Sequence, residues 1–183
     1  MKLLCLCTLA GLCALAARGA DGAGSTISAV LDGQLKMTES EVVSLAEAMP
    51  AEKYQFAPKN GEFTGVRTFG QQVTHIAAVI NVTAASVLGD PKPDTGKSEN
   101  GPASLHSKEE IVKYLKDAFA YGHKAMRSIT DQSATQMIHS AFGNSQVPRL
   151  NMATVPVWHS FDHYGQMVVY ARMNGIVPPA SRR

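Results

Sequence analysis

The stretch from Trp158 to Gln166, WHSFDHYGQ, holds the side chains of this sequence best suited to chemistry. His159 and His163 lie four residues apart, so in a helix their imidazoles project from one face about one turn apart. Gln166 and Tyr170 continue the same face. A polar stripe of this kind indicates either a metal site or a pair of hydrogen-bonded core histidines, and the spacing alone leaves both interpretations open.

A third histidine lies far upstream at an inward position. His75 follows the alternating steps of four and three that also contain Gln72, Val79 and Val82. Three neutral imidazoles bind a divalent ion and leave a coordination position open for water or substrate, which is typical of a catalytic rather than a closed structural site. Such an ion lowers the pKa of its bound water toward about 7. Zinc suits three histidines best, and nickel, iron and manganese accept the same type of ligand.

The elements that must position these residues are helices. Apolar residues recur at steps of three and four over four segments, and Pro50, Gly175 and the pair Pro178–Pro179 mark ends. The predicted helices cover about 26–49, 67–88, 107–129 and 151–174. We also predict a short helix around 134–140, and no segment shows the alternation typical of a strand. The fold class is therefore all-α, and four helices of this length suit an up-down four-helix bundle, which builds cofactor sites from inward side chains.

The connection 89–106 between the second and third helices is polar and rich in Pro and Gly. A structureless connection of this length is uncommon inside a compact domain. It is interpreted either as a plain flexible loop or as a cover over a pocket.

The N-terminus has the pattern of a secretory signal. Lys2 is followed by an apolar run over 3–17 and then by small residues. We expect a signal peptide of about 1–22, cleaved somewhere within 16–24, and a mature domain over 25–183; an uncleaved anchor is the alternative. The protein is then exported, to the periplasm or beyond the cell, without stable membrane insertion after cleavage.

Cysteine and charge narrow the chemistry further. Cys5, Cys7 and Cys13 all lie in the presumed signal, so the mature chain has no disulfide, no thiolate nucleophile and no cysteine ligand for a metal. The 17 basic and 15 acidic residues give a formal charge of +2, and removing Lys2 and Arg18 leaves a neutral body. This balance gives no electrostatic reason to expect a nucleic-acid partner.

Two stretches carry a family resemblance. HSFDHYGQMVVYARMNGIVPPAS resembles the final helix of the DinB-like family of metal-dependent hydrolases, and FAPKNGEFTGVRTFGQQVTHIAAVIN is similar to its second-helix motif. The resemblance covers about 26–181. It implies an up-down bundle, often a homodimer, with a divalent ion on His75, His159 and His163.

Three functions are compatible with these sequence features. The first is a hydrolase that uses metal-activated water on a small-molecule substrate, with a thiol-cofactor-dependent transferase as a variant that the resemblance admits. The second is a non-catalytic metal- or ligand-binding bundle, and the third is a metal-free structural dimer.

The candidate catalytic residues are Gln166 and Tyr170. Gln166 either hydrogen-bonds a ligand histidine or metal-bound water, or makes a simple interhelical hydrogen bond. Tyr170 either donates to substrate or packs in the core. Asp162 is expected at the surface. The three histidines outside the motif are expected at the surface or in loops. These histidines are His106, His123 and His139.

Overall fold

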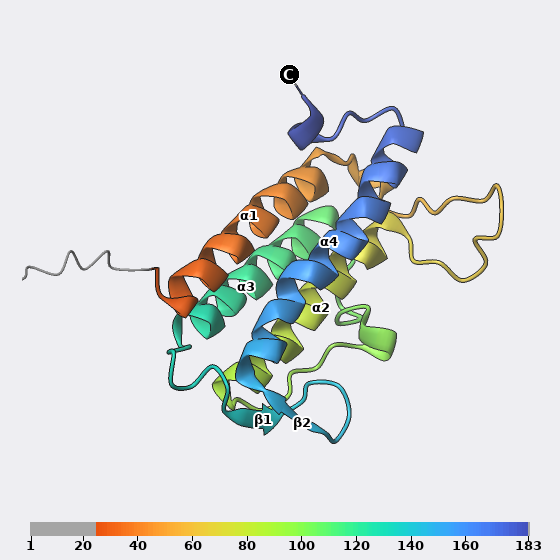
Figure 1. Cartoon of the computed structure of the whole chain (residues 1–183). Coiled ribbons are helices and arrows are strands. Elements are labelled where there is room, and N and C mark those ends of the chain that lie inside the picture. Colours follow the sequence, from red (N-terminus) through yellow and green to blue (C-terminus); the bar gives the residue numbers. More distant parts are fainter. Residues whose placement is uncertain (1–24, 183) are drawn as a thin grey trace, which may run out of the picture.

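The computed structural model describes residues 25–182, and the predicted signal peptide, 1–22, lies outside them. Four long helices dominate this part of the chain: α1 (Ile27–Ala48), α2 (Phe69–Leu88), α3 (Lys108–Arg127) and α4 (Arg149–Met173) (Figure 1). Two short strands, β1 (Met137–His139) and β2 (Gln146–Pro148), precede α4. The predicted four-helix bundle is confirmed, with each helix within a few residues of its expected bounds.

Side-chain caps explain where three of the helices begin. The Thr26 hydroxyl accepts a hydrogen bond from the Ala29 N–H at the start of α1. Thr68 with Gln71, and Ser107 with Glu110, form reciprocal capping boxes at the starts of α2 and α3. These contacts satisfy backbone N–H groups that have no partner within the helix itself.

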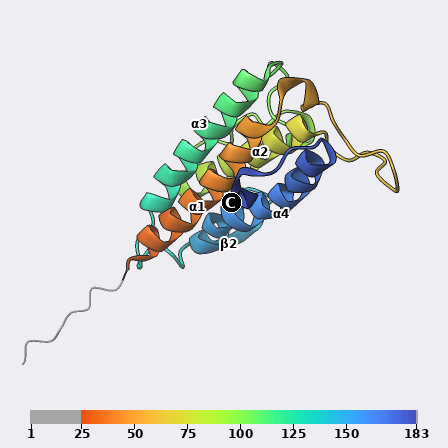
Figure 2. The same ribbon diagram turned by 90° about the horizontal axis from the view of Figure 1, so that it is seen from above.

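The helices do not simply alternate in direction. α2 packs between α3 and α4, and α1 contacts the same two helices from the opposite side (Figure 2). The first residues of α3 lie beside the end of α1, because Lys108 Nζ donates to the Glu47 carbonyl at 2.7 Å. The start of α2 lies beside the end of α1 as well, since Tyr54 donates its hydroxyl to the Ala46 carbonyl and accepts the Gly70 N–H with its own carbonyl. α2 and α3 therefore run in the same direction, which differs from the expected up-down order. The long connection 89–107 is what carries the chain back along the bundle.

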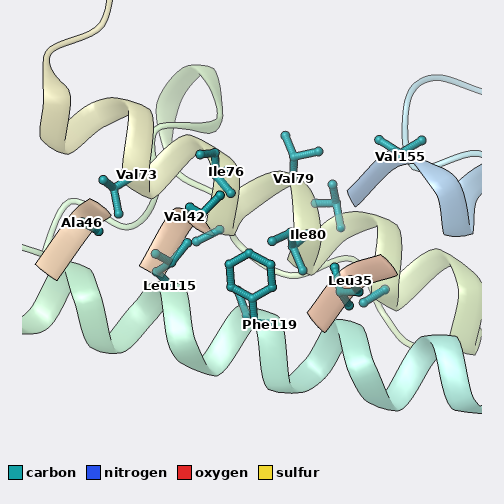
Figure 3. Packing of buried hydrophobic residues seen from close by; sticks show 14 of the residues in the cluster. Leu35, Val42, Ala46, Val73, Ile76, Val79, Ile80, Leu115, Phe119 and Val155 are labelled. Atoms are coloured by element: carbon teal, nitrogen blue, oxygen red, sulfur yellow. The ribbon is translucent and has the colours of Figure 1, made fainter. Parts of the chain in front are cut away.

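The apolar core draws on all four helices, and α4 contributes Val155, Met167 and Ala171 to it. Ile76 and Ile80 of α2 meet Phe119 of α3 and Leu35 of α1, and all four side chains are fully buried (Figure 3). Gly122 allows these helices to approach closely, because a Cβ there would lie 3.0 Å from Leu35 Cδ2 and 3.1 Å from Ile80 Cγ2. The polar site described below occupies a different contact, between α2 and α4.

The expected short helix around 134–140 is wrong. Instead β1 and β2 form an antiparallel hairpin in which Ile138 pairs with Val147, and both residues pack against the core. The Gln136 carbonyl accepts from the Arg149 N–H at 2.8 Å, which ties the segment to the first residue of α4. Strands of three residues are too short to show alternation in the sequence.

Within residues 25–182, no helix combines the length and apolar character needed to cross a membrane.

Candidate metal centre

The three predicted metal ligands come together between α2 and α4. The ring centroids are 4.5 Å apart for His159 and His163, 4.7 Å for His75 and His163, and 5.0 Å for His75 and His159. One nitrogen of each ring lies within 4.8 Å of the other two. His75 and His163 are buried, whereas His159 is partly exposed. The group is therefore largely enclosed, and His159 is its most exposed member.

The antiparallel contact of α2 with α4 is fixed at both of its ends. At one end, the Arg149 guanidinium donates to the Val87 carbonyl. At the other end, the Tyr170 hydroxyl donates to the Arg67 carbonyl at 3.3 Å. The histidines lie between these two contacts, so the helix register that places them is set from both sides.

A backbone carbonyl sets the tautomer of His75. Its Nδ1 lies 2.9 Å from the Glu99 carbonyl oxygen. A carbonyl can only accept, so Nδ1 carries the proton and Nε2 keeps its lone pair. This is the second contact that histidine ligands typically make in metal sites.

Two glutamines set the tautomer of His163 in a similar way. Gln72 Nε2 donates to Gln166 Oε1 at 2.9 Å, and Gln72 Oε1 lies 2.6 Å from His163 Nδ1. With this orientation of the amides, Nδ1 donates and Nε2 is free for a ligand. Gln166 thus makes an interhelical hydrogen bond and reaches the histidine through Gln72.

The third ring, His159, faces His163 through its own Nε2 at 3.2 Å. Two imidazole nitrogens on one tetrahedral zinc ion stand about 3.3 Å apart, so the spacing fits joint ligation. A hydrogen bond between the two rings would satisfy only this pair and make no use of His75 Nε2. One divalent ion would accept a lone pair from all three rings. The donor set therefore fits a metal.

The surroundings keep the rings neutral. Burial, reinforced by the charges of His163, His75 and Arg67, lowers the pKa of His159 to about 3. Burial, reinforced chiefly by His75, lowers the pKa of His163 to about 4. Burial also lowers the pKa of His75, although the hydrogen bond with Glu99 opposes that change. All three are thus in the neutral form that binds metals at pH 7.

The other residues singled out from the sequence lie as follows. Tyr170 is buried, and its hydroxyl contacts the Arg67 carbonyl. Asp162 is exposed, as expected, and so are His106 and His139.

The expectation that His123 lies at the surface or in a loop is wrong. It is buried in α3, with Nδ1 2.6 Å from Asp32 Oδ1 and Nε2 3.2 Å from Glu39 Oε2. The two carboxylates lie seven residues apart on one face of α1, and only the packing of α1 against α3 brings them to the ring.

Sequence reasoning missed the parts played by Gln72 and Glu99. Gln72 had a detectable signal, because a glutamine three residues before His75 in an apolar stripe needs a polar partner. Glu99 acts through its backbone carbonyl, which leaves no side-chain signature in the sequence.

The metal-free protein should lose stability as the pH falls from 7 to 5. His159 and His163 have folded pKa values of about 3 and 4. Unfolded histidines titrate near 6.5, so over this interval the unfolded state binds more protons and the free energy of unfolding decreases. Urea unfolding of chelator-treated protein at pH 7, 6 and 5 measures the slope.

Two variants control this measurement. A His159→Asn, His163→Asn double variant should show a shallower slope, whereas His106→Asn, at an exposed position, should match the wild type. Equal slopes in the wild type and the double variant would contradict the assignment of depressed pKa values.

Solved structures with this fold are known. A DinB-like protein from Bacillus cereus is 18% identical, with a TM-score of 0.67, over 84% of this chain and 96% of that one. A DinB-like protein from Bacillus subtilis is 15% identical, with a TM-score of 0.57, over 84% and 99%. YfiT from Bacillus subtilis, described as a probable metal-dependent hydrolase with an unusual four-helix bundle topology, is 16% identical, with a TM-score of 0.59, over 81% and 88%.

No curated protein matches the sequence. At these identities the solved structures establish the fold alone. The family model of the DinB superfamily matches residues 34–167, which include all three histidines and most of the bundle. This chain therefore belongs to the DinB superfamily.

Proposed function

We propose that this protein is an exported metal-dependent hydrolase with a divalent ion on His75, His159 and His163. The observation that carries the proposal is the convergence of three neutral imidazoles, two of which carry the proton on a hydrogen-bonded Nδ1 and keep the lone pair on Nε2. When bound by three histidines, zinc or a similar ion keeps a coordination position open and activates water for hydrolysis. The description of YfiT as a probable metal-dependent hydrolase supports this reading by analogy.

We propose that a small molecule approaches the site beside His159. That ring is partly exposed, and the neighbouring Trp158 is 58% exposed, with its ring centroid 5.9 Å from that of His159. An exposed indole beside the histidines would provide an apolar surface on which part of a substrate can rest. His75 and His163 form the buried side and hold their positions through Glu99 and Gln72.

Protein purified without a histidine tag should contain about one divalent ion per chain. Elemental analysis measures the content, and a His159→Ala, His163→Ala double variant should lose it because only one ligand remains. His139→Ala is the matched control, since His139 is exposed in β1. Absence of a stoichiometric metal from the wild type would contradict the proposal.

Turnover separates an enzyme from a metal-binding bundle. The metal-loaded protein is screened against esters, amides and thiol-transfer substrates, and hydrolysis should disappear in His75→Ala and after chelation. Hydrolysis that survives both treatments would contradict a role for this site, and stoichiometric metal without turnover of any substrate would contradict the assignment as an enzyme.

The proposal of export rests on the N-terminal sequence, with its lysine and following apolar run. Intact-mass measurement on protein recovered from a bacterial periplasm or culture medium should show the loss of 16–24 residues. A full-length cytoplasmic product would contradict export and leave the metal centre unaffected.

We propose in addition that two copies pair through the outer face of α4. Phe161, Val169 and Met173 are exposed on this face at steps of four and eight residues. Gly165 lies between them, and a Cβ there would have no neighbour within 4 Å. An apolar stripe with a central gap of this kind suits packing against another helix.

The face is complementary to itself about a two-fold axis near residue 167. In an antiparallel pair, Phe161 faces Met173 of the second copy and Gly165 faces Val169. The same register places the exposed Asp162 opposite the exposed Arg172. An isologous interface makes each such contact twice, so size and charge complementarity both favour a second copy as the partner.

Charge reversal tests this dimer. Asp162→Arg should weaken dimerisation roughly tenfold, because two ion pairs become two repulsive contacts, and adding Arg172→Asp should restore it. Sedimentation velocity gives the dimer dissociation constant, with Asp117→Arg on the exposed face of α3 as the control. A monomeric wild type at tens of micromolar, or no recovery in the double variant, would contradict the interface.

A further inference from the structure

The connection between α2 and α3 contains a segment of unusual backbone beside the histidines. Ser98 and Glu99 are the only non-glycine residues within 25–182 with positive φ, at 56° and 57°. Gly96 and Gly101 flank them with φ of 68° and 82°. Left-handed backbone is unfavourable for residues with a Cβ, so other contacts must hold this segment in place.

The segment 95–101 closes on itself. The Gly101 N–H donates to the Thr95 carbonyl at 2.9 Å, and the Asn100 N–H donates to the Lys97 carbonyl at 3.3 Å. The closure leaves no room at one position, since a Cβ on Gly96 would lie 1.9 Å from the Gly101 oxygen. We call 95–101 the carbonyl loop, because it presents the Glu99 carbonyl to His75.

The Arg67 side chain donates hydrogen bonds to the carbonyl loop on both sides of Glu99. Its Nε donates to Asn100 Oδ1 at 2.8 Å, and its Nη2 donates to the Ser98 carbonyl at 3.1 Å. Glu99, between these two residues, accepts the His75 Nδ1–H at 2.9 Å. A planar guanidinium can make two such bonds in a fixed geometry, which a lysine ammonium cannot reproduce.

Arg67 is itself well anchored. It directly precedes Thr68, the N-cap of α2, and its carbonyl accepts the Tyr170 hydroxyl of α4. The path from Tyr170 through Arg67 to the loop thus begins on the helix that supplies His159 and His163.

We propose that Arg67 is a positioning residue for His75, which holds the carbonyl loop so that His75 keeps its proton on Nδ1 and presents Nε2 to a metal ion. This inference rests on the proposed function, since His75 is taken as a ligand there. It also assigns Tyr170, a candidate catalytic residue from the sequence, to the support of Arg67.

Two variants weaken the same contact from opposite sides. Arg67→Gln removes the guanidinium that hydrogen-bonds Ser98 and Asn100, and Gly96→Ala prevents closure of the carbonyl loop. Each should weaken Co²⁺ binding by roughly 10- to 100-fold, the usual effect of losing a partner of a ligand histidine. Cobalt absorption in a titration against a competing chelator gives the affinity. Gly143→Ala is the control, because Gly143 also has positive φ, at 81°, but nothing lies near its Cβ position.

The tautomer of His75 provides a readout that does not need metal. In chelator-treated wild-type protein at pH 7.5, ¹⁵N NMR should show His75 with its proton on Nδ1, and both variants should show a mixture of tautomers. Arg67→Lys should resemble Arg67→Gln, because lysine restores the positive charge but not the pair of guanidinium hydrogen bonds. An unchanged tautomer and an unchanged Co²⁺ affinity in Arg67→Gln and Gly96→Ala would overturn the proposal.

The Co²⁺ titration and the tautomer measurement together distinguish failure of the proposed function from failure of the positioning role of Arg67. If the wild type binds no metal, the proposed function fails, while the metal-free tautomer still supports or overturns the role of Arg67. If the wild type binds Co²⁺ but the variants keep both its Co²⁺ affinity and its His75 tautomer, only the positioning role fails.

Discussion

The antiparallel register between α2 and α4 is the constraint on which the site depends. His75 meets His163, and Gln72 meets Gln166, three residues away on each helix in opposite directions. The end contacts, Arg67 with Tyr170 and Val87 with Arg149, continue the same register. A shift of one residue along α4 would rotate its side chains by about 100° and separate every pair at once. One helix contact thus places the three histidines and the Gln72–Gln166 hydrogen bond together.

Within the contact of α2 with α4, the cost of burying polar rings determines which hydrogen-bond partner each imidazole needs. A buried donor without a partner costs about 1–3 kcal/mol, so each buried imidazole needs a hydrogen bond on the nitrogen that does not face the site. His163 obtains one from α2 through Gln72, and His75 obtains one from the carbonyl loop. His159 is the exception, because its Nδ1 atom is buried and has no protein partner in the described part of the chain, although the residue as a whole is more exposed than the other two. The hydrogen-bonded support is therefore strongest at His75 and His163, and the least supported ring is the more exposed His159.

The sequence predicts those features that are local or periodic. Steps of three and four give the helices, Ser107 and Gly175 mark boundaries, and the spacing of His159 and His163 gives a shared face. Features that depend on packing between distant segments could not be predicted in this way. The shared direction of α2 and α3, the burial of His123 against α1 and the hairpin at 137–148 belong to this group. The sequence placed Gln166 and Tyr170 on the correct face of α4. Their hydrogen-bond partners, Gln72 and Arg67, follow only from the register between α2 and α4.

The connection 89–107 shows why composition can mislead about order. Its glycines and small polar residues suggest a mobile loop, yet the same residue types are needed for a tight left-handed backbone. Gly96 is there because its Cβ position is filled by the Gly101 carbonyl, and Gly101 because a Cβ would lie 3.0 Å from Thr74. Ser98 and Glu99 carry a Cβ, yet both are held at a positive φ that such residues disfavour. A backbone that is unfavourable on its own persists only when its surroundings determine it, and here they include the guanidinium of Arg67 and the imidazole of His75. The connection that returns the chain along the bundle is therefore also part of the surroundings of the three histidines.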